Sequence, residues 1–243
     1  YVGALPIFID VEPAYCQMDP QRLADFLANE CVWRNGALYD QVSGRRIRAL
    51  LPVHILGHPV DMAPLLDLAR KYELVVIEDA TEGLGAKYHA EAVGHLGEIA
   101  CFSFNGNKLI TTGGGGMIVT DNAVWAERAK YLTTQAKDDP LEYVHGAVGY
   151  NYRLPNVLAA MGVAQMECLD EFICLKREIA TRYSNAFQML PGIELPTQAP
   201  WAFSTFWLYT IMVNAEVFGM DGRRMLQKLD AQGIQTRPLW QPL

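Results

Sequence analysis

The segment that most constrains the fold is residues 74–77, a run of Leu, Val, Val and Ile without a polar interruption. Such an apolar, β-branched run is typical of a strand that is covered on both faces of a sheet. Strand-like runs also occur at 49–54, 99–104 and 117–120, and amphipathic helical patterns flank them. This alternation predicts an α/β fold, a doubly wound and mainly parallel sheet with helices on both faces. Ligands bind such sheets at the carboxyl ends of the strands, so a site is expected there.

The sequence before and after these strands predicts further elements. We expect a strand at 4–11, then a helix at Asp19-Pro20, and a polar surface loop at 133–145. The expected N-caps of three helices are Asp19, Asp61 and Asp121.

A long helical pattern begins after Pro155 and ends at Pro191-Gly192. The last elements expected are a strand at 207–213, a helix at 221–232 that Gly233 ends, and a strand at 234–237. A long helix that leads into a small α+β unit suggests a domain boundary within that helix. We therefore expect a large domain at 1–165 and a small C-terminal domain at 166–243.

Composition excludes several classes of function. Of the 243 residues, 51% are hydrophobic and 19% are charged, against roughly 25% charged in typical soluble domains. The net charge of −7 does not provide the basic surface that nucleic-acid binding needs. The most apolar stretch, 201–213, is shorter than the roughly 20 residues of a membrane-spanning helix. The high apolar share leaves room for a second buried surface, such as a subunit interface.

Cysteine and histidine positions predict neither disulfides nor a metal site. The five cysteines form no CxxC pair, which argues against a zinc site and is typical of a protein of the reducing cytoplasm. His54 and His58 are four residues apart, but Gly57 and Pro59 argue against a shared helical face. The first residues also lack the basic lead and the cleavage site of a signal peptide.

Three polar segments follow predicted strands, and each has two interpretations. Glu78 and Asp79 are either a helix cap or solvated turn, or acids held at the mouth of the sheet against a cationic ligand group. Lys108 is either a surface residue or a lysine beside apolar strands, where partial loss of water favours the nucleophilic amine. The sequence TTGGGG at 111–116 is either a flexible turn or backbone that passes close to a ligand.

Taken together, four segments resemble a known family. They are PVHILGHPVDM at 52–62, VIEDATEGLGA at 76–86, FSFNGNKLITTGGGGM at 102–117 and GYNYRLPN at 149–156. Their order and spacing are similar to those of the sugar-nucleotide aminotransferases of the DegT/DnrJ/EryC1/StrS family. The resemblance covers nearly the whole chain. It implies the fold type I of pyridoxal phosphate (PLP) enzymes, with PLP as the cofactor.

The resemblance also implies a role for each matching residue. Lys108 matches the lysine that forms a Schiff base with the cofactor and later moves a proton. Asp79 matches the acid that faces the pyridine nitrogen, which keeps the ring protonated as an electron sink. Ser103 matches a hydroxyl that contacts the phosphate. Asn151 matches an asparagine that reaches the cofactor phosphate of the neighbouring subunit, so a homodimer with a shared active site is implied.

Other positions are implied less directly. Glu82 matches a cofactor-binding position at which many relatives place glutamine against the ring oxygen, and its charge could change the electronics of the cofactor. The substrate-binding positions that the resemblance implies are Asn105, Arg153, Trp207, Arg237 and Trp240. For the two tryptophans, packing in the core is an equal alternative.

The SFNGNK version of the lysine motif is most similar to the branch that aminates UDP-4-keto-6-deoxy-N-acetylglucosamine, on the way to bacillosamine- and legionaminic-acid-type sugars. The implied reaction transfers an amino group from glutamate to C4 of a nucleotide-linked sugar, for cell-surface glycan synthesis. Two alternatives stay open. One is a PLP-dependent sugar dehydratase, in which the lysine is commonly replaced by histidine. The other is a non-catalytic binding or regulatory relative.

The family pattern also extends beyond both ends of this sequence. Relatives carry phosphate-binding residues before the position of Tyr1 and continue past Leu243. We therefore expect the chain to be the middle and later part of an enzyme. On its own it is expected to bind PLP weakly or not at all.

Overall fold

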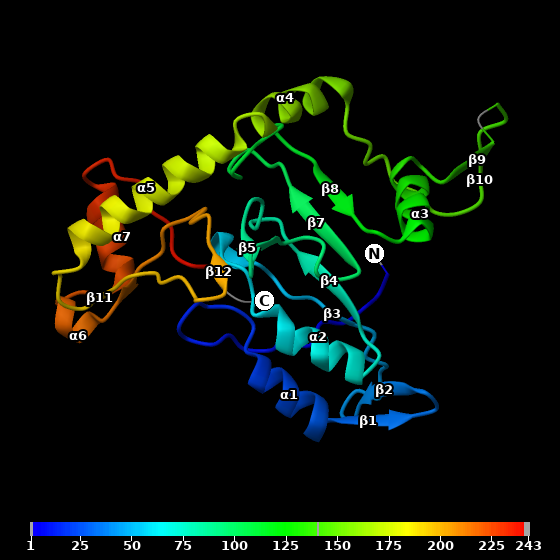
Figure 1. Ribbon diagram of the computed structural model, residues 1–243, viewed down its shortest axis with the longest axis horizontal. Coiled ribbons are helices and arrows are strands. Elements are labelled where there is room, and N and C mark those ends of the chain that lie inside the picture. The colour runs from blue at the N-terminus through cyan, green and yellow to red at the C-terminus, as the bar shows by residue number, and fades with distance from the viewer. Residues whose placement is uncertain (1, 140, 241–243) are drawn as a thin grey trace.

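A computed structural model describes residues 2–139 and 141–240 of the chain, and its centre is a four-stranded sheet (Figure 1). The strands lie in the order β3 (Ala49–Leu50), β4 (Val75–Asp79), β7 (Ile99–Ser103) and β8 (Gly116–Val119). The first three are parallel, and β8 runs antiparallel to β7. The predicted α/β fold with a mainly parallel sheet is therefore confirmed. Tyr1, Pro140 and residues 241–243 lie outside the described residues.

The two faces of the central strand β4 are buried to different extents. Val76 and Glu78 are fully buried, whereas Val75, Ile77 and Asp79 are half-buried. Successive side chains of a strand point to opposite faces, so one face of β4 meets the core and the other is partly open. The prediction of a strand is confirmed, but within the described residues its second face is covered only in part.

Two helices pack on the buried face of β4, and both lie below the sheet in Figure 1. They are α1 (Pro20–Asn29) and α2 (Met62–Lys71). Asp19 caps α1 as predicted, since its Oδ1 accepts a hydrogen bond from the backbone N–H of Gln21 at 2.8 Å. Asp61 precedes α2 as predicted, but its Oδ1 accepts from the Tyr88 hydroxyl at 2.7 Å, and its side chain does not cap the helix.

Leucines on these helices form the centre of the core. Leu23 and Leu27 of α1 and Leu65 of α2 pack with Val76 of β4, and each is almost inaccessible to water. Full burial of a leucine side chain contributes about 1.5–3 kcal/mol. The apolar face of α1 is therefore what joins this helix to the sheet.

A hairpin that was not predicted follows α1. It consists of β1 (Cys31–Arg34) and β2 (Ala37–Asp40), which pair antiparallel. Asn35 and Gly36 form its two-residue turn, with φ of 50° and 69°. An Asn-Gly pair between two strand-like runs is a strong hairpin signal, so the sequence did contain this information.

The expected strand at 4–11 is wrong. In the described part of the chain its backbone is irregular apart from a single bridge between Val11 and Met18. Leu5 and Phe8 are each 64% exposed. Strand propensity stabilises an extended segment only when a neighbouring strand pairs with it, and none of the described strands runs beside 4–11.

The segment after β8 differs from prediction in two details. The helix α3 (Ala123–Thr133) is capped by Asn122 and not by Asp121, because Asn122 Oδ1 accepts from the Val124 N–H at 3.0 Å. The predicted loop at 133–145 contains a short antiparallel pair, which protrudes from the molecule in Figure 1. Its strands are β9 (Lys137–Asp139) and β10 (Val144–His145).

The long helix predicted after Pro155 is two helices in succession, which run above the sheet in Figure 1. They are α4 (Asn156–Met166) and α5 (Leu169–Phe187), separated at Glu167 and Cys168. The apolar side of α5 buries Ile173 and Ala180, whereas α4 buries no side chain fully within the described structure.

Short elements follow α5. They are β11 (Ile193–Glu194), β12 (Ala202–Phe203), β13 (Met212–Val213), α6 (Ala215–Phe218) and α7 (Gly222–Asp230). Asp221, at which this helix was expected to begin, caps α7, because its Oδ1 accepts from the Arg224 N–H at 2.8 Å. Of the strand expected at 207–213, only β13 forms, and the strand expected at 234–237 is wrong because this segment is exposed coil. The segment 207–210 contacts α5 through a side chain instead, since the Tyr209 hydroxyl is 2.9 Å from the Ser184 Oγ.

Pairing between distant segments joins this later part to the sheet region. β12 pairs with β5 (Lys87–Tyr88), which also pairs with β6 (Glu91–Ala92). The residues near 202 therefore lie against the segment that follows β4. Across the described ranges, no helix combines the length and the apolarity that crossing a membrane requires.

Candidate functional site

Two predicted site residues lie at the carboxyl ends of neighbouring strands. Asp79 ends β4 and is paired in register with Cys101 of β7, and Ser103 ends β7 two residues later. The Asp79 Oδ1 accepts from the backbone N–H of Thr81 at 3.1 Å, which closes a turn directly after the strand. Asp79 is thus both a turn-forming acid and an acid at the mouth of the sheet. Glu78 was expected to follow the strand, but it lies within β4 and is buried.

Lys108 lies beside Glu82 in this region. The Lys108 Nζ is 3.5 Å from the Glu82 Oε1, and the two side chains are 14% and 11% exposed. The other oxygen, Glu82 Oε2, accepts a hydrogen bond from the backbone N–H of Leu56 at 2.8 Å. Lys108 is therefore not a surface lysine, because a partly buried carboxylate with a second fixed partner holds its ammonium.

Trp207 covers the same lysine from the C-terminal part of the chain. The Lys108 Nζ lies 4.4 Å from the centroid of the Trp207 ring, and the Trp207 Nε1 donates to the carbonyl of Asn107 at 2.9 Å. Trp207 is 2% exposed, and Trp240 stacks parallel to it with centroids 6.3 Å apart. Lys176 of α5 donates to the Trp207 carbonyl at 3.0 Å, and burial lowers the pKa of this lysine.

The glycine-rich segment at 111–116 has a packing explanation. A Cβ on Gly116 would collide with the carbonyl oxygen of Phe102, the residue before Ser103, which is the register partner of Gly116 on β7. Thr112 is buried, and the N–H of Thr111 donates to the Gln165 Oε1 of α4 at 2.8 Å. The segment therefore places backbone close to backbone and joins the sheet to α4.

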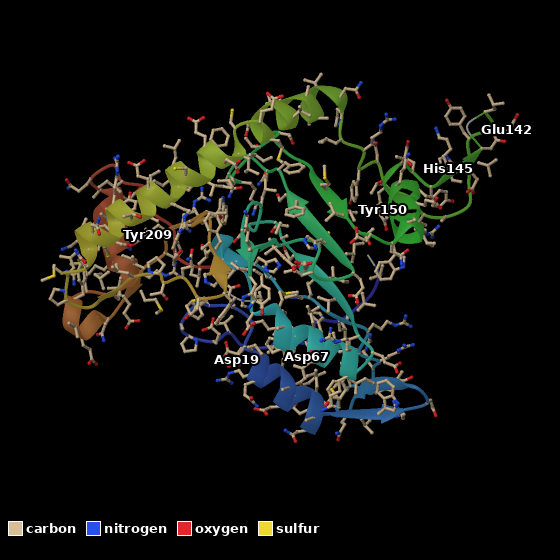
Figure 2. All side chains as sticks on the ribbon, in the orientation of Figure 1. Asp19, Asp67, Glu142, His145, Tyr150 and Tyr209 are labelled. Carbon is tan, nitrogen blue, oxygen red and sulfur yellow. The ribbon has the colours of Figure 1, made fainter. Side chains whose placement is uncertain are left out.

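The remaining predicted site residues are exposed, and two of them, Asn105 and Trp240, border the cluster of Asp79, Glu82, Ser103, Lys108 and Trp207. Asn151 pairs with Thr134 at the end of α3, and Figure 2 shows its neighbour Tyr150 beside that helix. Arg153 follows on the same segment, and Arg237 lies in the exposed C-terminal coil. Asn105 is exposed next to the lysine turn, where its carbonyl accepts from the Lys108 N–H at 3.0 Å.

A buried pair of ionisable residues behind the site was not predicted. The His54 Nε2 is 2.9 Å from the Glu78 Oε2, and both side chains are fully buried. The Val60 N–H donates to the His54 Nδ1 at 3.1 Å, so the Nε2 carries the proton that is donated to Glu78. Gly94 and Gly97 also donate backbone N–H groups to this carboxylate, at 2.8 and 2.6 Å. The signal in the sequence was a glutamate at the position of the strand that shares a face with Val76.

His58 gives a prediction for stability against pH. Its Nδ1 donates to the Pro59 carbonyl at 2.8 Å and its Nε2 accepts from the Ala199 N–H at 3.1 Å, so the folded protein holds a neutral ring. Burial lowers the pKa of His58 below its ordinary value of 6.5, although the Pro59 carbonyl and Glu12 oppose this shift. Below that value the unfolded chain binds a proton that the folded one does not, so stability should fall as the pH falls.

Thermal unfolding at about pH 7.5 and about pH 5.5 would measure this effect. Replacing His58 by Gln should reduce the drop in midpoint between the two pH values. Replacing the exposed His95 by Gln is the matched control and should leave the drop unchanged. An equal drop in the wild type and in His58→Gln would contradict the assignment.

The described residues contain no group of three or more His, Cys, Asp or Glu side chains that could hold a metal ion. The ligand chemistry at the strand ends is instead an amine, carboxylates and a hydroxyl. Such a polar cluster at the carboxyl edge of an α/β sheet is where ligands bind in this class of fold.

The chain belongs to the DegT/DnrJ/EryC1/StrS aminotransferase family, whose model matches residues 1–243. Over the whole chain it is 39% identical to EpsN of Bacillus subtilis (strain 168), by name a pyridoxal phosphate-dependent aminotransferase, and covers 59% of that protein. It is also 35% identical to the GDP-perosamine synthase of Caulobacter vibrioides, covering 100% of this chain and 61% of the relative.

A solved structure with the same fold is that of S. venezuelae DesV in complex with a ketimine intermediate. It has a TM-score of 0.81 and 30% sequence identity, and the match covers 96% of this chain and 57% of that one. The expected fold type I and the expected family, with its cofactor PLP, are thereby confirmed. The chain spans about three fifths of the length of these relatives.

Proposed function

We propose that the protein is a PLP-dependent aminotransferase that transfers an amino group from glutamate to C4 of a nucleotide-linked 4-keto-6-deoxy sugar. The observation that carries the proposal is the Lys108 amine, partly buried beside Glu82 at the strand ends that present Asp79 and Ser103. Membership of the aminotransferase family supports the same reaction. The retained lysine favours transamination over the dehydratase alternative, and this set of side chains favours an enzyme over a binding protein.

The chemistry of these side chains fits PLP. The cofactor has an aldehyde that a lysine amine can attack, a pyridine nitrogen that a carboxylate can keep protonated, and a phosphate that accepts hydrogen bonds. Lys108, Asp79 and Ser103 supply one matching group each. Asp79 ends β4 and Ser103 ends β7, and these two strands are hydrogen-bonded neighbours. We infer that these residues hold PLP here, with Glu82 near the ring.

Each residue has a task in the proposed mechanism. PLP, when bound, supplies the electron sink that makes the substrate carbon acidic. Asp79 would keep the pyridine nitrogen protonated, and the hydrogen bond from the Thr81 N–H keeps its carboxylate in place. The Lys108 amine would take the proton from the substrate carbon as general base and deliver it as general acid. Glu82 lies within reach of the lysine nitrogen, and Trp207 excludes water from that side.

The substrate is proposed to be UDP-linked N-acetylhexosamine, because of the SFNGNK motif at 103–108. A relative with 35% identity is named GDP-perosamine synthase, so a GDP-linked sugar is the competing choice. Asn105, Arg153, Arg237 and Trp240 are proposed substrate contacts. The enzyme would act in the cytoplasm, and its product would serve the synthesis of cell-surface glycans.

We further propose a homodimer in which Asn151 reaches the cofactor phosphate of the partner subunit. The exposure of Asn151 and the apolar, uncovered surface of α4 support this arrangement, since Val157 is 73% exposed and Val163 is 61% exposed. The two proposed domains, 1–165 and 166–243, would meet where Trp207 covers Lys108.

The experiment that tests the proposal uses the complete protein. Borohydride reduction with PLP should fix the cofactor on one peptide, the one that contains Lys108, because reduction makes the covalent link permanent. Incubation with glutamate and a UDP-, dTDP- or GDP-linked 4-keto-6-deoxy sugar should then give a 4-amino sugar with one of the three. A protein that neither retains PLP at Lys108 nor aminates any of them is not an aminotransferase. Loss of the C3 hydroxyl without amination would identify the dehydratase.

A further inference from the structure

We propose that Trp207 is a positioning residue for Lys108. Together with Glu82 it forms a lysine clamp, defined here as these two side chains, that holds the ammonium whenever the amine is not covalently engaged. The Nζ is 3.5 Å from the Glu82 Oε1 and 4.4 Å from the centroid of the Trp207 ring. A carboxylate and the face of an indole ring are both favourable partners for a cation, more so where water is largely excluded.

Trp207 is itself held in a way that packing alone does not require. Its Nε1 donates to the carbonyl of Asn107, the residue directly before Lys108, at 2.9 Å. One side chain therefore contacts both the backbone and the amine of the lysine turn. Any displacement of Trp207 would move the two together, which is the property expected of a positioning residue.

A single turn of the chain positions both halves of the clamp. It is the short helix η1 (Ile55–Gly57), in which the Leu56 N–H donates to the Glu82 Oε2 at 2.8 Å. The carbonyl of Gly57 accepts from the Thr205 N–H at 2.9 Å, two residues before Trp207. Gly57 has φ of 80°, and a Cβ there would lie 2.9 Å from the backbone nitrogen of Trp207, so only glycine permits this approach.

The clamp has a chemical purpose that rests on the proposed function. A lysine that bonds reversibly to a cofactor is free during part of each cycle, and a free lysine side chain on a four-carbon stem samples many rotamers. Holding the amine between Glu82 and Trp207 keeps it at the site in one conformation. Its return to the cofactor then requires little reorientation.

The test measures the reactivity of Lys108 in the complete protein after removal of the cofactor. Limited acetylation with acetic anhydride, followed by peptide mass spectrometry, gives the rate at Lys108 relative to the exposed Lys130. Glu82→Gln and Trp207→Leu should each raise this ratio about fivefold, because each removes a partner of the ammonium. Trp207→Phe keeps an aromatic face and should give a smaller increase.

Trp201→Leu is the matched control, since Trp201 is a partly buried tryptophan that packs on the core formed around Leu65. It should leave the ratio unchanged. An unchanged ratio in both Glu82→Gln and Trp207→Leu, with circular dichroism like that of the wild type, would overturn the clamp. Glu82→Gln changes no side-chain volume, so it decides the question if Trp207→Leu does not fold.

A second measurement tests positioning itself. At a fixed PLP concentration, the rate at which the visible absorption of the lysine-bound cofactor develops should fall about tenfold in Trp207→Leu. Faster acetylation with an unchanged rate of cofactor capture would overturn the positioning role. A wild-type protein that never captures PLP on Lys108 would refute the proposed function instead, and the acetylation ratios would still decide the clamp.

Discussion

Replacing Lys108 by alanine is expected to reduce turnover by at least about a thousandfold, the scale of a lost general acid–base group that is also the covalent residue. Lys108 is the lysine of the site at the strand ends, with its Nζ held by Glu82 at 3.5 Å. Without it, the proposed cofactor contacts of Asp79 and Ser103 would remain, but no amine would be left to bond to the cofactor or to move the proton. Amino-group transfer from glutamate to the sugar nucleotide measures the loss.

Two observations make this prediction specific. Borohydride treatment of Lys108→Ala with PLP should leave no cofactor covalently attached to the peptide that contains position 108, because only a reduced Schiff base with a lysine there would be permanent. Lys130→Ala on the exposed surface of α3 is the matched control and should keep full activity. Wild-type turnover in Lys108→Ala would contradict the assignment of the catalytic lysine and with it the proposed function.

Replacing Glu78 by glutamine is expected to lower the free energy of unfolding by about 1–3 kcal/mol, although no contact with a ligand is involved. The carboxylate is fully buried and accepts from His54, Gly94 and Gly97. An amide has one acceptor oxygen, so its NH₂ group would face a backbone N–H and leave that donor without a partner. Urea unfolding at neutral pH measures the difference.

The pH dependence of Glu78→Gln gives a second check. Burial by itself raises the pKa of Glu78, but the hydrogen bonds from His54, Gly97 and Gly94 outweigh burial and hold the pKa below its ordinary value of 4.5. The carboxylate therefore stabilises the fold fully above that pH, and the contribution is lost as the pH falls through the lower folded value. The gap between wild type and Glu78→Gln should close in acid.

Glu127→Gln, an exposed substitution on α3, is the matched control for Glu78→Gln and should change stability by less than about 0.5 kcal/mol. His54→Ala should also destabilise, and the double variant should lose less than the sum of the two, because both act on one buried pair. A loss below about 1 kcal/mol in Glu78→Gln would show that the pair is dispensable.

Local pattern explains which elements were predictable. The strands of the sheet, the cap at Asp19 and the helical pattern of α5 follow from apolar periodicity and from capping chemistry, which act within a few residues. The hairpin at Asn35-Gly36 also follows from a local signal, the Asn-Gly turn between two strand-like runs. Elements that depend on a distant partner were predicted wrongly, since the strands expected at 4–11 and 234–237 have no described neighbour with which to pair.

The sequence by itself determined the class of fold, the family and the chemical groups available for catalysis, because four ordered motifs lie on strands and turns that form locally. Only the tertiary structure decided which groups meet. Lys108 contacts Glu82 and Trp207, 26 and 99 positions away, and Glu78 pairs with His54. These contacts depend on how β4, η1 and the segment near 205 pack, and packing is set by side-chain volume and burial across the whole fold and not by local spacing.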